Sequence, residues 1–297
     1  MERTGRYLLP IGGAVLDLSS RTHIIGILNV TPDSFSDGGR FTGGGYEIDV
    51  QKAVEAALMM AGDGADIIDV GGESTRPGSG RLSAADEIKR VVPVIEGIRK
   101  SSRVPISIDT YKAVTAWAAI EAGADMVNDI SGLAFDPDMA GVVAGSGAAL
   151  VLMHIKGTPE GMQDNPHYGD LVGEVKAYLL AAAEKAAKAG VAHDKILLDV
   201  GIGFGKTVEH NTALINRLDE FTALGYPLLL GVSRKAFIGR LTGAAGPDDR
   251  LEGSIAAAVM GIARGANILR VHDVKATKRA ALVADAILAS DNMRPAR

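Results

Sequence analysis

Cysteine is absent from the 297 residues, which excludes disulfide scaffolds, thiolate zinc sites and catalytic thiols. Basic residues are not in excess: 31 lysines and arginines stand against 36 aspartates and glutamates, a formal net charge of −5. That balance predicts no nucleic-acid partner. The longest apolar runs, near residues 24–30 and 226–233, fall short of the ~20 residues of a membrane span. Because the amino terminus also lacks the apolar segment of a signal peptide, we expect no membrane association and a cytoplasmic location.

Aromatic residues are scarce at 4% of the chain, whereas glycine is plentiful at 37 residues. The glycines are not gathered in a low-complexity stretch, so they indicate tight turns and close helix–sheet packing rather than disorder. Together with abundant alanine, valine, isoleucine and leucine, this composition favours an α/β fold.

Eight short apolar runs alternate with longer alanine-rich segments that have helical spacing. The predicted strands are His23–Asn29, Asp66–Val70, Val104–Asp109, Met126–Asp129, Ala149–His154, Lys195–Val200, Pro227–Ser233 and Asn267–Val271. The predicted helices include Glu47–Gly62, Ala84–Arg99, Ala113–Ala122, Leu171–Ala189, Thr212–Leu224 and Leu251–Arg264. Apolar strands that are each followed by a helix indicate buried parallel strands in βα units.

Eight βα units close a (β/α)8 TIM barrel, whose usual size is about 250 residues. We therefore predict one domain, with a short N-terminal lead (1–22), the barrel (23–289) and a polar tail (290–297). A doubly wound open sheet is the main alternative fold. It would need a break between two lobes, and no proline- and serine-rich linker is visible in the sequence.

Polar side chains fall at the carboxyl ends of nearly all the predicted strands, where TIM barrels carry their chemistry. They are Asn29, Glu73–Gly78, Asp109, Asn128, Asp129, His154, Asp199, Ser233–Lys235 and Arg270–Asp273. Packing alone does not explain polar groups at one end of so many strands. We therefore predict that they form a rim that faces a bound ligand.

The residue types of this rim suit a particular kind of ligand. Carboxylates and an amide at Asp109, Asn128 and Asp199 can bind a planar heterocycle with several N–H and C=O groups. Cationic donors follow strands 7 and 8, where many barrels bind phosphate; they are Lys235, Arg270 and His272. No cluster of histidines and acids has metal-ligand spacing, so a metal would be Mg²⁺, held by one or two oxygens and by substrate phosphates.

Each of these residues also has an ordinary structural interpretation. Asp109 and Asp199 could be helix N-caps, and Asn29 could cap the following turn. Lys235 could extend into solvent. We interpret Asp129 as structural, and the strand-end His154 as a rim histidine satisfied by its neighbours.

Seven ordered segments resemble the dihydropteroate synthases of the folate pathway, a family of pterin-binding enzymes. They are GILNVTPDSFSDGG (26–39), DVGGESTRPGS (69–79), PISIDTYKA (105–113), NDISG (128–132), GIGFGKT (201–207), GVSRKAFIG (231–239) and RVHDV (270–274). The resemblance runs from the first predicted strand to the last. It implies a (β/α)8 barrel, usually a homodimer, that joins 6-hydroxymethyl-7,8-dihydropterin diphosphate to 4-aminobenzoate and releases diphosphate.

The same resemblance assigns the site residues. It implies a pterin pocket on Asp109, Asn128, Asp199 and Lys235. A diphosphate site would involve Asn29, Thr75, Arg270 and His272, with Asn29 as the residue linked to Mg²⁺. An aminobenzoate site would lie around Phe35, Arg76, Pro77, Phe204 and Arg234. Catalytic roles are expected for Asp109, Lys235, Arg270 and His272.

The implied reaction breaks a C–O bond to a good leaving group. We expect an SN1-like path, in which Mg²⁺ assists the departure of diphosphate and Asp109 favours the positive charge left on the pterin methylene carbon. Loops 30–45 and 73–83 would close over this cation and exclude water.

The sequence departs from the family pattern at two positions. Val200 stands where the family usually has proline, which loosens the backbone angle of the loop after Asp199. Ala236 stands where the family often has serine, which concerns one hydrogen bond near the aminobenzoate ring or the affinity for sulfonamides, not the reaction.

Two other functions are compatible with a pterin-binding barrel. Pterin-binding methyltransferases share the barrel and an Asp/Asn pterin site, but they have no need of a diphosphate site such as Arg270 and His272. A non-catalytic paralogue should have lost loop or diphosphate residues, and the sequence retains them. The synthase is therefore the function that we predict.

Overall fold

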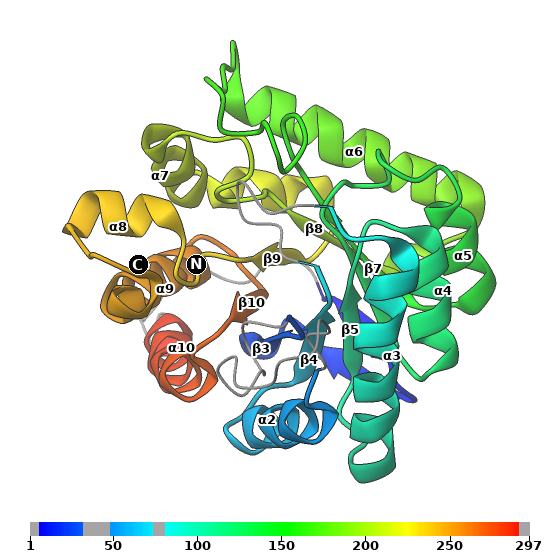
Figure 1. Ribbon diagram of the computed structural model, residues 1–297. Coiled ribbons are helices and arrows are strands. Elements are labelled where there is room, and N and C mark those ends of the chain that lie inside the picture. The colour runs from blue at the N-terminus through cyan, green and yellow to red at the C-terminus, as the bar shows by residue number, and fades with distance from the viewer. Residues whose placement is uncertain (1–5, 32–47, 74–80, 291–297) are drawn as a thin grey trace.

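The computed structural model describes residues 6–31, 48–73 and 81–290. Eight parallel strands close into a barrel in the order β10-β3-β4-β5-β6-β7-β8-β9, surrounded by helices (Figure 1). The strands are β3 (His23–Asn29), β4 (Ile67–Gly71), β5 (Ile106–Asp109), β6 (Met126–Asp129), β7 (Ala149–Met153), β8 (Ile196–Asp199), β9 (Leu228–Leu230) and β10 (Ile268–Val271). The predicted (β/α)8 barrel is confirmed, and the open-sheet alternative is wrong because β10 pairs with both β9 and β3.

The described helices follow the strands as predicted. They are α2 (Val50–Gly62), α3 (Ala84–Ser101), α4 (Ala113–Glu121), α5 (Met139–Ser146), α6 (Leu171–Ala189), α7 (Val208–Asn216), α8 (Ala236–Thr242), α9 (Leu251–Ala263) and α10 (Val274–Ala289). The predicted helix over Thr212–Leu224 is instead divided between α7 and the 3₁₀ helix η2 (Leu218–Leu224). The break falls at Arg217, where the backbone leaves helical values (φ −108°, ψ 21°).

Helix α6 illustrates how these sequences specify a helix on the outside of a barrel. Its N-cap Asp170 accepts a hydrogen bond from the Gly173 N–H, and its C-cap Gly190 takes a left-handed φ of 104° that glycine adopts without strain. Between the caps, the buried side chains recur every three or four residues along one face. None of the helices in the described parts of the chain is long and apolar enough to cross a membrane.

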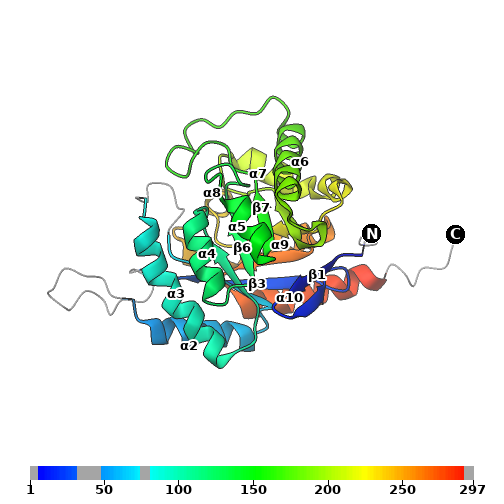
Figure 2. The same ribbon diagram turned by 90° about the vertical axis from the view of Figure 1, so that its right-hand side faces the viewer.

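The barrel interior is apolar at the amino ends of the strands. There, apolar residues from every barrel strand except β5 pack against a hairpin formed by β1 (Leu8–Ile11) and β2 (Ala14–Asp17). The hairpin buries Leu9 and Ile11, and β1 lies beside η1 (His193–Lys195), at the amino end of β8. Strand β1 is the dark blue strand labelled in Figure 2. The hairpin lies within the segment predicted only as a lead, so the sequence analysis missed it. With this end filled by apolar side chains, the carboxyl ends are left for polar groups.

Candidate active site at the carboxyl end of the barrel

Strand register places the predicted polar residues of the first strands side by side. Asn29 pairs with Gly71, Gly71 pairs with Asp109, and Asp109 pairs with Asn128. Because Gly71 lacks a side chain, there is a gap in this row. A Cβ added there would lie 3.5 Å from the Asp109 Cβ and 3.9 Å from Asn29 Oδ1. The register therefore brings an amide and a carboxylate to the two sides of a space that a glycine keeps free.

An arginine from the last strand crosses to this row and binds two carboxylates. Arg270 donates from Nε to Asp69 Oδ2 and from Nη2 to Asp109 Oδ2, each at 2.6 Å. Asn128 Nδ2 donates to the same Asp69 oxygen at 3.2 Å. These contacts join β10, β4, β5 and β6 into one polar network. Three of its members, Asp109, Asn128 and Arg270, were predicted as site residues.

Asp69 is a member of the network that the sequence analysis missed. Its side chain is 1% exposed, and its Oδ1 has no hydrogen-bond partner among the described residues. The sequence did carry a signal, because Asp69 interrupts the apolar strand IIDVG and buried aspartates are rare unless they are paired. A buried carboxylate oxygen without a donor is a vacant acceptor at the base of the site.

The charged groups of the network shift one another's pKa values. Burial raises the pKa of Asp109 to about 7, against the opposing effect of the Arg270 guanidinium. Burial also disfavours the charge on Arg270, but the carboxylates of Asp69 and Asp109 outweigh it and raise the arginine's pKa. Arg270 is therefore a permanent cation, while Asp109 can change its protonation state near neutral pH.

On the opposite side of the barrel, Asp199 lies beside a second glycine gap, and Lys235 is close enough to interact with it electrostatically. A Cβ added at Gly231 would lie 3.8 Å from Asp199 Oδ2 and 3.9 Å from the Arg270 Cβ. Burial lowers the pKa of Lys235 to about 8, with Arg270 acting in the same direction and Asp199 opposing. The Lys235 ammonium lies 4.1 Å from the centre of the Phe204 ring, a cation–π contact. The structure thus brings Asp199, Lys235 and Phe204 together.

His272 lies next to this group, and its surroundings disfavour the positive charge that the sequence analysis expected. Its Nδ1 is 3.0 Å from Ser233 Oγ, and its backbone N–H donates to the same hydroxyl at 3.1 Å. Burial, followed by the charge of Arg270, lowers the pKa of His272 to about 3. The imidazole is therefore neutral at pH 7 without an anionic ligand, and it would act through hydrogen bonding rather than charge.

Two of the structural alternatives for these residues are wrong. The N-cap of α4, which follows Asp109, is Lys112, and the N-cap of α7, which follows Asp199, is Thr207. Neither strand-end aspartate therefore caps the helix that follows it. Asp129, by contrast, accepts hydrogen bonds from the N–H groups of Ser131 and Leu133, as the structural interpretation expects.

Other predicted residues are not brought into the network. The Arg234 guanidinium pairs with Asp273 at 2.7 Å and with Asp248 at 2.6 Å. Some predicted site residues lie outside the described residues, namely Phe35, Thr75, Arg76 and Pro77. So does most of the two loops that were expected to close, 30–45 and 73–83.

The donor set can be tested against the expected Mg²⁺. The described residues contain no group of three or more histidine or acidic side chains that could hold a metal ion by themselves. Asn29 is half-buried at the end of β3, and its side chain makes no hydrogen bond with the described residues. A single amide oxygen fits Mg²⁺ held largely by water and substrate phosphates, and it does not fit a permanently bound metal.

A buried lysine is the second polar residue that the sequence analysis missed. Lys206 is 2% exposed, and its Nζ lies 2.8 Å from His154 Nδ1 and 3.0 Å from the Phe204 carbonyl oxygen. Burial lowers the pKa of Lys206 to about 7. His154 is thus a histidine satisfied by its neighbours, as predicted. The signal for Lys206 was its place in GIGFGKT, one of the seven segments.

Comparisons with known proteins agree on one family. The family model for pterin binding enzymes matches residues 25–272. A dihydropteroate synthase from Synechocystis sp. is 46% identical over 279 residues, covering 94% of each chain. The solved structure of Xanthomonas albilineans dihydropteroate synthase with 4-aminobenzoic acid has a TM-score of 0.87 and 42% identity, covering 96% of this chain and 99% of that one. A complex of the Xanthomonas enzyme with 7,8-dihydropteroate has a TM-score of 0.84 and 40% identity, covering 95% and 99%.

Proposed function

The chain belongs to the pterin-binding enzymes, in the dihydropteroate synthase family, and from this premise we propose how its residues carry out the reaction. The reaction joins the methylene carbon of 6-hydroxymethyl-7,8-dihydropterin diphosphate to the amino group of 4-aminobenzoate and releases diphosphate. The observation that carries the proposal is the polar network of Arg270, Asp69, Asp109 and Asn128 beside Asp199 and Lys235.

The pterin ring is held by the carboxylates and the amide. Asp109, Asn128 and Asp199 come from three different strands and offer acceptors and a donor to the edges of a flat heterocycle. Lys235 supplies a donor from the turn before α8. The two glycine gaps at Gly71 and Gly231 keep space between these groups for a planar ring.

Cations and neutral donors hold the diphosphate. Arg270 keeps its charge, and His272 contributes a hydrogen bond from its neutral imidazole. Asn29 and the diphosphate together would hold Mg²⁺, which supplies Lewis-acid neutralisation of the leaving group when bound. Thr75 extends the same site in this proposal, whereas Phe35, Arg76, Pro77, Phe204 and Arg234 surround the aminobenzoate.

The bond to the leaving group breaks before the new bond forms. The electron pair of the C–O bond passes to the diphosphate oxygen, where Arg270 stabilises it, and the electron-rich dihydropterin delocalises the positive charge left on its methylene carbon. In its ionised form, which the contact with Arg270 favours against the effect of burial, Asp109 stabilises that charge. The neutral aniline nitrogen of 4-aminobenzoate attacks the carbon and then loses a proton, so no strong general base is needed.

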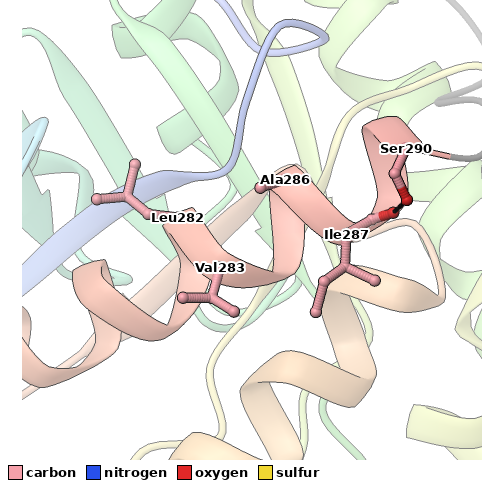
Figure 3. A pocket seen from close by; sticks show the side chains of 5 residues that line it. All are labelled: Leu282, Val283, Ala286, Ile287 and Ser290. Atoms are coloured by element: carbon pink, nitrogen blue, oxygen red, sulfur yellow. Dashed lines mark hydrogen bonds between the residues drawn. The ribbon is translucent and has the colours of Figure 1, made fainter. Parts of the chain in front are cut away.

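A homodimer is also part of the proposal, and an apolar face of α10 supports it. Leu282, Val283 and Ile287 are 54%, 61% and 65% exposed, and with Ala286 and Ser290 they line a shallow pocket (Figure 3). Contiguous exposed apolar side chains of this kind commonly mark protein–protein contacts.

The pair V283E and I287E tests this surface, because two buried carboxylates would oppose its association with a second copy. We expect the wild type to sediment as a dimer at micromolar concentration and the double variant as a monomer. The variant L241E, at another exposed leucine, is the control and should stay dimeric. A monomeric wild type would refute the dimer, and a dimeric double variant would refute this surface.

Diphosphate release from dihydropterin diphosphate, with and without 4-aminobenzoate and Mg²⁺, tests the proposed function. We expect sustained release and dihydropteroate formation only when both are present. Pterin binding without product would indicate a non-catalytic paralogue. Absence of pterin binding would contradict the proposal.

A further inference from the structure

The proposed reaction gives no role to Lys206, although burying a lysine costs free energy that some interaction must offset. Its Nζ donates to the Phe204 carbonyl oxygen at 3.0 Å and contacts His154 Nδ1 at 2.8 Å. We propose that Lys206 is a positioning residue, which fixes the loop Gly201–Lys206 so that the Phe204 ring forms a wall of the aminobenzoate site. This inference rests on the proposed function, because that function gives Phe204 its role.

The loop approaches the segment that follows β7 closely at two points, Gly201 and Gly205. Gly201 and Gly205 have φ values of 69° and 64°, which residues with a side chain rarely adopt. A Cβ added at Gly201 would lie 1.9 Å from the His154 carbonyl oxygen, and one at Gly205 would lie 2.5 Å from the Lys156 carbonyl oxygen. Glycines allow this close approach, but they contribute no side chains of their own to hold the loop. Gln163 and Tyr168 donate hydrogen bonds to the carbonyl oxygens of Gly203 and Gly205. Lys206 adds a bond to the carbonyl oxygen of Phe204 itself.

His154 is suited to accept the Lys206 bond in a fixed orientation. Its ring packs edge-on against Tyr178, with centroids 4.8 Å apart, and is tilted against Tyr168 at 6.0 Å. Burial and the neighbouring Lys206 hold the pKa of His154 at about 2, so the ring is neutral. A neutral ring that carries its proton on Nε2 presents a lone pair at Nδ1 to the Lys206 ammonium, and the aromatic neighbours restrict the ring from turning away.

Above Lys206, the loop contacts the pterin side of the site. The Phe204 ring lies 4.1 Å from the Lys235 ammonium, and a Cβ added at Gly203 would lie 3.2 Å from the Lys235 Cδ. A shift of the loop would therefore move the Phe204 ring relative to a group of the pterin pocket. Lys206 reaches the substrates only through Phe204, so its loss should weaken aminobenzoate binding more than pterin binding.

Steady-state kinetics of K206M test this role against a merely structural one. Methionine keeps most of the length of the unbranched side chain and removes the donors. We expect the KM for 4-aminobenzoate to rise about tenfold, while the KM for dihydropterin diphosphate changes by less than twofold. Lys176→Met is the matched control: it removes a partly buried cation on α6 that bonds Glu220 and lies over the Phe221 ring, and it should leave both constants unchanged.

A double-mutant cycle with F204L tests the route of the effect. If Lys206 acts through Phe204, K206M should change the aminobenzoate KM by less than twofold in the F204L background. Additive effects, an unchanged KM in K206M, or an equal loss for both substrates would each overturn the inference. Should K206M not fold, K206Q, which retains an amide donor, enters the same cycle with the same outcomes. A wild type that makes no dihydropteroate would refute the proposed function instead.

Discussion

Arg270 stands at the centre of the site at the scale of single residues. It reaches from β10 past β3 to carboxylates on β4 and β5, which are 201 and 161 residues away along the chain. Asp69 is almost fully buried, so the pair is screened from solvent and fixes the guanidinium. Asp69 thus sets the position of the Arg270 guanidinium without itself needing to contact the substrate.

The variant D69N tests this positioning role. An amide of the same shape leaves the Arg270 cation with one carboxylate instead of two, so the guanidinium loses its fixed orientation. We expect kcat/KM for dihydropterin diphosphate to fall about 100-fold, equivalent to about 2.7 kcal/mol. The control is D66N, which removes the carboxylate that Arg21 binds at the other end of the barrel and should change kcat/KM by less than twofold. A D69N enzyme within threefold of wild type would contradict the role.

At the residue scale, Asp109, Asn128 and Asp199 lie at the carboxyl ends of their strands, as predicted, because their place in the sequence already sets them at this end of a barrel. Their roles in binding the substrate stay predictions. Asp69 and Lys206 escaped because one lies inside a strand and the other at the end of a glycine loop. The neutrality of His272 depends on burial and on Arg270, neither of which the sequence displays.

At the scale of elements, the loop between β8 and α7 shows how backbone conformation shapes the site. Asp199 ends the strand, and its Oδ1 accepts the Gly201 N–H at 2.7 Å, so the carboxylate and the loop hold each other. The capping box of Thr207 and His210 then starts α7. These contacts fix the end of β8 and the start of α7. Between them lie only a few residues, of which three are glycines in the left-handed conformation.

Gly201→Ala should damage both stability and binding. The left-handed conformation costs a residue with a Cβ about 1–2 kcal/mol, and the overlap with the His154 carbonyl adds about 1–3 kcal/mol. Gly225→Ala is the control, because Gly225 has φ 79° but no described atom within 4 Å of an added Cβ. Urea unfolding should show the larger loss for G201A, together with a raised aminobenzoate KM. Equal losses of unfolding free energy for G201A and G225A would refute the close approach of Gly201 to the His154 carbonyl.

Strands and helices were predicted from the spacing of apolar residues, and this failed where an element was only a few residues long. Strands His23–Asn29 and Met126–Asp129 were predicted to the residue, because long or sharply bounded apolar runs leave little choice. The hairpin was missed, although Gly12 and Gly13 take the positive φ values of a two-residue turn and apolar residues flank them. Four-residue strands are too short for alternation to identify them reliably.

The whole molecule divides stability and chemistry between the two ends of one barrel. Leu9 and Ile11 of the hairpin close an apolar layer at the amino ends, whereas the buried charges lie at the carboxyl ends. Burying charged groups costs free energy that an apolar layer can offset. The sequence predicted the barrel from its eight units, but the closing hairpin and the ion pairs across the barrel arise only in the folded chain.

The variant L9A tests this division. Removing a leucine side chain that is 1% exposed should lower the free energy of unfolding by about 2–5 kcal/mol. The KM values should stay within twofold of wild type, because the cavity opens at the far end from the site. L8A, at a 40% exposed leucine next to it, should be nearly neutral in urea unfolding. If L9A changed a KM value without lowering the free energy of unfolding, this separation of stability from substrate binding would be contradicted.

The rate of diphosphate release in a single turnover of D109N tests the central claim most directly. If Asp109 favours the cation left by the departing diphosphate, replacing its carboxylate with an amide should slow C–O cleavage about 100-fold or more, while the folded state persists in unfolding measurements. Cleavage at a near-normal rate would contradict the account, because the carboxylate that Arg270 holds would then have no part in the reaction.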